Sequence, residues 1–111
     1  MTDTAGLKRA MERNKKAVKL RPTVARGTSV SRATIVGGST CEVVQGPYKL
    51  IVDLPKSEGG SDRGPSPEKL GLGALGSCLA IGIVMHAAAN EVPLDTVSVE
   101  VQADWDGRGT F

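Results

Sequence analysis

Three short runs with strand character follow one another in the first half of the chain, and glycine-containing turns separate them. The runs are Thr28–Val36, Cys41–Gln45 and Tyr48–Leu54, and the turns are Gly37-Gly38 and Gly46-Pro47. Runs rich in β-branched residues and joined by turns this short are typical of antiparallel neighbours. The pattern therefore predicts an antiparallel strand meander.

A helical period precedes the strands. Apolar residues fall near one face of residues 4–20, and Lys and Arg occupy the rest of the surface. Pro22 ends this helix because proline cannot continue the hydrogen-bond ladder. The period changes directly afterwards, so we expect an N-terminal amphipathic helix in residues 1–22, appended to one domain in residues 23–111.

A long uncharged stretch from Leu70 to Ala89 follows a helix-start signal. Ser66 is a preferred N-cap, Pro67 suits the first helical position, and Glu68 complements the helix dipole. A helix that is apolar all round is buried on all sides. We therefore expect a long buried central helix.

Glycine occurs four times in this stretch, although each one costs a helix about 1 kcal/mol relative to alanine. The positions are Gly71, Gly73, Gly76 and Gly82. Without a Cβ, another backbone can approach closely, so we expect the helix to touch its own sheet and a second helix. One chain of 111 residues could hardly cover it, which favours a homodimer. A membrane span is disfavoured because glycine and alanine make the hydrophobicity weak.

Beyond the helix, Val97–Trp105 alternates apolar and polar residues, which predicts a half-buried strand. The expected fold class is thus α+β, with a strand meander, the long central helix and one further strand.

Charge and composition narrow the function only slightly. The net charge of +2, from fourteen basic and twelve acidic residues, is too balanced to indicate nucleic-acid binding. The polar, charged first twenty residues do not resemble a secretory signal, so we expect a cytoplasmic protein. Two cysteines and one histidine at these spacings do not fit a zinc site, and we expect no metal and no cofactor.

Two motifs then suggest a family. Gly64-Pro65-Ser66-Pro67-Glu68-Lys69-Leu70, followed by Ala74-Leu75-Gly76-Ser77-Cys78-Leu79-Ala80, resembles the OsmC/Ohr family of osmotically inducible and organic-hydroperoxide-resistance proteins. In that family a Pro-Glu-x-Leu helix start leads to an Ala-x-Gly-x-Cys core. The resemblance, from about Thr28 to Trp105, implies an α+β fold, an intertwined homodimer and reduction of organic hydroperoxides.

The resemblance also implies that Cys78 is the peroxidatic cysteine and that Glu68 belongs to its site. A thiolate attacks a peroxide oxygen and becomes a sulfenic acid. Ten residues at 1.5 Å rise place Glu68 about 15 Å from Cys78 along one helix. The two residues can therefore share a site only across two chains, or through a bridging group.

The thiolate needs a cation, because the free cysteine pKa is about 8.5. In the family an arginine follows the Gly-Gly turn, whereas Ser39 stands at that position here. Arg63, in the loop before the helix, ranks ahead of Arg26 and Arg32 as a substitute. For each of the three, ordinary surface solvation is the commoner role.

Three interpretations remain open. Glu68 and Cys78 favour a peroxidase that acts on a hydroperoxide, uses an unknown thiol reductant and binds neither nucleic acid nor membrane. Ser39 favours a non-catalytic dimeric binding module. The third is an inactive fragment, since the family's second helix and resolving cysteine would follow Phe111 and the domain would be incomplete at its C-terminus. Cys41 is more typical of a small buried strand residue than of a resolving thiol.

Overall fold

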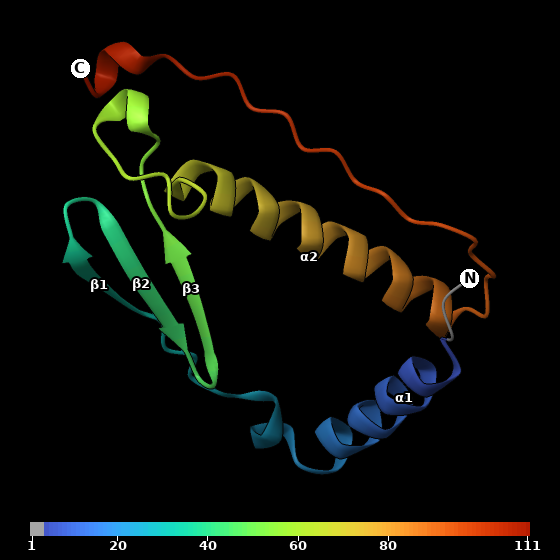
Figure 1. Ribbon diagram of the computed structural model, residues 1–111. Coiled ribbons are helices and arrows are strands. Elements are labelled where there is room, and N and C mark those ends of the chain that lie inside the picture. The colour runs from blue at the N-terminus through green and yellow to red at the C-terminus, as the bar shows by residue number, and fades with distance from the viewer. Residues whose placement is uncertain (1–3) are drawn as a thin grey trace.

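The computed structural model describes residues 4–111, which form helices, a sheet and a long extended segment (Figure 1). The main elements are α1 (Ala5–Leu20), β1 (Arg32–Gly37), β2 (Thr40–Gln45), β3 (Tyr48–Val52) and α2 (Pro67–Ala89). Short 3-10 turns occupy Pro22–Ala25, Lys56–Glu58 and Gly107–Gly109. The expected α+β class is confirmed.

The sheet of this described region is antiparallel in the order β1-β2-β3, as the meander prediction required. Two cross-strand rows form its apolar face: Ile35–Cys41–Val52 and Ala33–Val43–Leu50. The opposite face is more polar and carries the Glu42–Lys49 ion pair at 2.6 Å. The first strand begins at Arg32 rather than at Thr28, because Arg32 already pairs with Val44 near the end of β2.

Helix α2 begins where the cap signal predicts. The Lys69 N–H donates to Ser66 Oγ at 3.4 Å, and Pro67 occupies the first turn.

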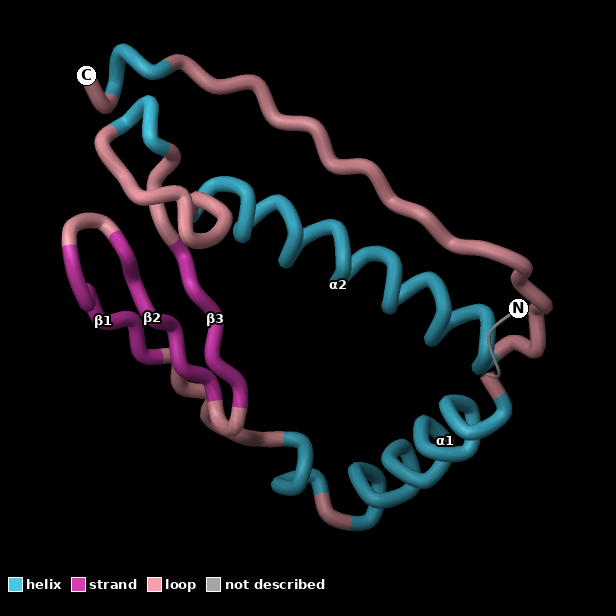
Figure 2. The backbone as a smooth tube through the Cα atoms, viewed as in Figure 1, coloured by secondary structure: helices cyan, strands magenta, loops and turns pink. Residues whose placement is uncertain are grey.

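The expectation that the helix is buried on all sides is wrong for a single chain. Of its residues, all of them described, Ala87 and Ala88 alone are buried, because α1 packs only against the C-terminal end (Figure 2).

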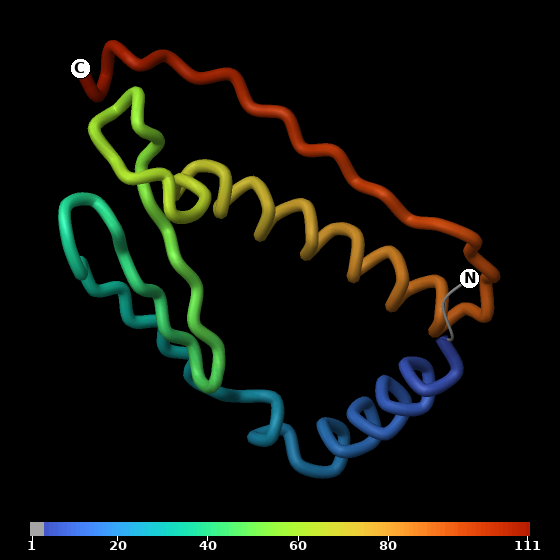
Figure 3. The backbone as a smooth tube through the Cα atoms, viewed as in Figure 1, coloured from blue at the N-terminus to red at the C-terminus, as the bar shows by residue number. Residues whose placement is uncertain are grey.

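The extended segment after α2 corrects the prediction of a strand at Val97–Trp105. This segment runs back alongside α2, where no described strand lies next to it to supply ladder hydrogen bonds (Figure 3). The alternation of apolar and polar residues still corresponds to burial. Val97, Val99 and Val101 are half-buried, and the residues between them are exposed. The segment therefore covers one side of the helix without joining the sheet.

The glycines of α2 meet different surroundings from those expected. A Cβ on Gly76 would lie 3.4 Å from Val101 Cγ2, so the close neighbour here is the extended segment and not a second helix. The same atom on Gly71, Gly73 or Gly82 would meet nothing within 4 Å. Three of the four positions thus face open space in the single chain.

The described chain is far more open than a packed domain. Its radius of gyration is 18.7 Å, against about 13 Å for a compact chain of this length. Its accessible surface is 9128 Å², against about 5,800 Å² for a compact monomer of 11.5 kDa. Among residues 4–111 the buried side chains are Val52, Ala87, Ala88, Thr40 and Asp53.

Two positions outside the helix require glycine, because another part of the backbone lies too close to leave room for a Cβ. The loop between β3 and α2 folds back onto the end of β3. A Cβ on Gly64 would lie 2.0 Å from the Ile51 carbonyl oxygen, and one on Gly60 would lie 2.0 Å from that of Leu54. Real Cβ atoms do not approach this closely, so a side chain at either position must displace backbone.

We expect Gly64→Ala to lower the free energy of unfolding by about 1–3 kcal/mol, as overpacking does. Gly37→Ala is the matched control, because a Cβ there meets nothing within 4 Å. Its effect should be about 0.5 kcal/mol or less. Urea denaturation measures both, and equal losses would contradict the close approach of the loop.

Candidate functional site

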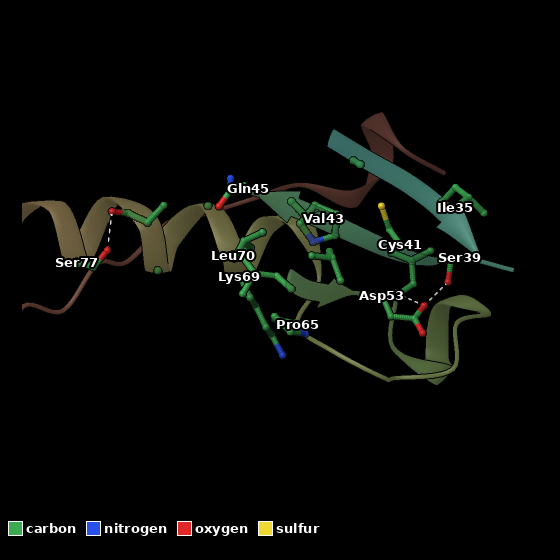
Figure 4. Close-up of a pocket in the computed structure, with 18 residues that line it drawn as sticks. Ile35, Ser39, Cys41, Val43, Gln45, Asp53, Pro65, Lys69, Leu70 and Ser77 are labelled. Carbon is green, nitrogen blue, oxygen red and sulfur yellow. Dashed lines mark hydrogen bonds between the residues drawn. The ribbon is translucent and has the colours of Figure 1, made fainter. Parts of the chain in front are cut away.

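Asp53, directly after β3, accepts hydrogen bonds from two separate parts of the chain (Figure 4). Its side chain is 1% exposed. The hydroxyls of Ser39 and Thr40 donate to Oδ1 and Oδ2 at 2.5 and 2.8 Å. The backbone N–H groups of Leu54 and Arg63 donate to Oδ1 and Oδ2 at 2.8 and 3.3 Å. Each carboxylate oxygen thus accepts two hydrogen bonds.

These donors favour the ionised carboxylate. The hydrogen bond from Ser39 does most to lower the pKa of Asp53, and those from Thr40, Arg63 and Leu54 add to it. Burial acts in the opposite direction, and the net result is a pKa lowered from 3.8 to about 2. Asp53 therefore carries a full negative charge at neutral pH.

Sequence reasoning missed this cluster. From the sequence alone, Asp53 is only a polar position in the third run with strand character, Tyr48–Leu54. The available signal was a carboxylate at the junction of that run with a loop, together with a Ser39-Thr40 pair after the first turn.

Arg63 lies at the turn between β1 and β2. Together with Ser61 it lines a small pocket of about 260 Å³ against that turn. The other lining residues are Val36, Gly37, Gly38 and Thr40. Arg63 is exposed, and no ion pair of its side chain occurs within residues 4–111. The arginine that we favoured from sequence therefore stands beside the Gly37-Gly38 turn.

Cys78 is a free, exposed thiol on α2. Leu75 and Gly82 share its side of the helix, and that side is bare in the single chain. Glu68 is exposed in the first turn of the same helix. Within the described part of the chain no hydrogen bond or ion pair links Cys78, Glu68 and Arg63, so one chain does not bring the three together.

A cleft of about 920 Å³ separates the apolar face of the sheet from the first half of α2 (Figure 4). Cys41 lines it from the sheet, and Gly73, Ala74 and Ser77 line it from the helix. Cys41 is half-buried and free. The cleft is mainly apolar, so it suits an apolar occupant.

The described residues contain no group of three or more His, Cys, Asp or Glu side chains that could hold a metal ion. One helix among them, Pro67–Ala89, is long and apolar enough to cross a membrane by length and composition alone. Core helices of soluble proteins pass the same test, so this finding is weak support for a membrane location.

The fold and the site define an α+β protein with a free thiol on the bare side of its long helix. Residues 59–111, which contain Arg63, Glu68 and Cys78, match the family model described as OsmC-like protein. The resemblance inferred from the motifs is confirmed over this segment. No curated protein gives a significant match to the chain.

We expect the stability of the protein to fall in acid because of Asp53. A carboxyl whose folded pKa is depressed stabilises the fold above its unfolded pKa, and this contribution disappears as the pH falls from about 4 to about 2. Asp53→Asn should lower the melting temperature at pH 7 and weaken its dependence on pH in that window.

Circular dichroism at a series of pH values measures this effect. Asp104→Asn, at an exposed position of the extended segment, is the control and should keep the pH dependence of the wild type. The assignment fails if both variants show the same acid profile.

Proposed function

We propose that this protein reduces organic hydroperoxides with Cys78 as the nucleophile. The observation that carries the proposal is the free thiol of Cys78, exposed on the bare side of α2. The OsmC-like match over residues 59–111 supports a role in stress defence.

The reaction balances as a two-electron reduction. The Cys78 thiolate attacks the terminal oxygen of the hydroperoxide, an S–O bond forms, and the O–O bond breaks. The leaving alkoxide takes a proton and departs as an alcohol, and the sulfur becomes a sulfenic acid. A thiol reductant then forms a mixed disulfide and releases water, and a second thiol restores Cys78.

The remaining groups of the site have distinct roles in this proposal. The guanidinium of Arg63 stabilises the thiolate and the developing alkoxide. Glu68 accepts hydrogen bonds that fix the guanidinium. The apolar cleft beside α2 suits the carbon chain of the substrate, and no metal or cofactor takes part.

A homodimer completes the site. Cys78 and Glu68 lie about 15 Å apart along one helix, so an antiparallel partner helix is needed to bring the two residues together. The surface supports this arrangement, because the single chain exposes about 3,300 Å² more than a compact monomer would. Two chains together carry about 6,600 Å² of such excess, and obligate dimers bury about 2,000–5,000 Å² or more in total. We place this dimer in the cytoplasm, where a peroxidatic thiol stays reduced.

The alternative is a dimeric binding module without catalysis. It is favoured by Ser39, whose hydroxyl is committed to Asp53 and supplies no positive charge. The two functions differ in whether Cys78 is activated, and a direct assay separates them.

Cys78→Ser should reduce peroxide consumption to the background rate, because a hydroxyl is a far weaker nucleophile than a thiolate. Cys41→Ser should still consume the first equivalent of cumene hydroperoxide at the wild-type rate. Stopped-flow mixing with one equivalent measures both rates. Equal loss in the two variants, or no consumption by the wild type, would contradict the proposal.

Leu75→Glu should weaken the dimer at least about tenfold, since it puts a charge on the bare side of α2. Val24→Glu is matched in exposure, at 53% against 51% for Leu75, but lies in the short 3-10 turn after α1 and should change the dimer little. Sedimentation velocity over a concentration series measures this. A wild-type protein that stays a folded monomer at all concentrations would rule out the dimer.

A further inference from the structure

The turn after β1 and the loop before α2 are joined through one carboxylate. Ser39 and Thr40 of the turn donate to Asp53 from one side, and the backbone of Leu54 and Arg63 donates from the other. Removal of this carboxylate would leave the two segments without their shared acceptor.

The loop is shaped to return Arg63 to this junction. The Asp53 N–H donates to the Pro65 carbonyl at 3.0 Å, and the Asp62 N–H donates to that of Leu54 at 3.1 Å. Asp62 has a φ of +55°, in the left-handed region, where aspartate occurs more often than most other residues. The backbone at Arg63 is therefore held on both sides.

Arg63 contributes to this junction through its backbone alone. Both oxygens of Asp53 already accept two hydrogen bonds each, so the carboxylate does not need the guanidinium. The positive charge of Arg63 thus remains available beside the Gly37-Gly38 turn, with which it lines one pocket.

We propose that Asp53 is a positioning residue, which holds Arg63 at the β1–β2 turn so that its guanidinium replaces the arginine missing at Ser39. The inference rests on the proposed function, in which this cation acts on Cys78. It also explains why a small hydroxyl residue follows Gly37-Gly38: Ser39 completes the carboxylate cluster that places Arg63.

The reactivity of Cys78 tests the inference without any peroxide. The rate of alkylation by iodoacetamide is measured against pH in the dimeric Cys41→Ser protein, so that Cys78 is the one thiol present. Arg63→Ala should slow alkylation at pH 7 severalfold, because the thiolate loses its neighbouring positive charge. Asp53→Asn should slow it by a similar factor, and the double variant should be no slower than either.

A rescue variant separates positioning from general damage. In the Arg63→Ala background, Ser39→Arg should restore fast alkylation, because it returns a guanidinium to the same turn. Arg63→Lys should keep most of the rate, since it keeps the charge. Arg13→Ala, an exposed arginine on α1, should leave the rate unchanged. If Asp53→Asn does not fold, Ser39→Ala and Thr40→Ala each remove one hydrogen bond and should slow alkylation partially.

The outcomes distinguish this inference from the proposed function. Alkylation that depends on Arg63 and Asp53, without peroxide consumption, would support the positioning role and overturn the peroxidase. Peroxide consumption with alkylation unaffected by Arg63→Ala or by the folded Asp53 or Ser39 variants would overturn the positioning role alone. Additive slowing in the double variant would also overturn it.

Discussion

The apolar surface of α2 exceeds what the described chain can cover, and the arrangement of the other elements follows from that excess. The extended segment lies along one side of the helix, and α1 packs against its C-terminal end. The sheet remains separated from its first half by an open cleft. Hydrophobic burial is the main driving force of folding. In the dimer proposed above, a second copy covers the part of the helix that these contacts leave bare.

Local signals in the sequence were enough to predict most of the elements. The turns at Gly37-Gly38 and Gly46-Pro47 set the strand boundaries, and Ser66 with Pro67 set the start of α2, because turns and caps depend on a few neighbouring residues. The prediction of a strand at Val97–Trp105 was wrong for a physical reason. Alternation shows that one face of a segment is covered, but it does not show whether a strand or a helix covers it.

The site shows the same difference between signals from neighbouring residues and contacts between distant ones. Cys78 and Glu68 could be singled out as candidates because their motif is short and continuous along α2. Asp53 was not found, because its donors lie fourteen, thirteen and ten residues away in the sequence, apart from Leu54. Spacing within one element cannot reveal a cluster that forms only when a loop folds back. The placement of Arg63 beside the first turn depends on that same return.

The exposed apolar side chains of α2 also affect how such a chain reaches its final state. Leu79, Ile81 and Ile83 are each about half accessible to solvent in the single chain. Until they are covered, they offer the kind of surface on which chaperones act and through which chains aggregate. Where a second copy supplies the cover, folding and association become one bimolecular process. The yield of native protein then depends on how quickly two newly made chains meet.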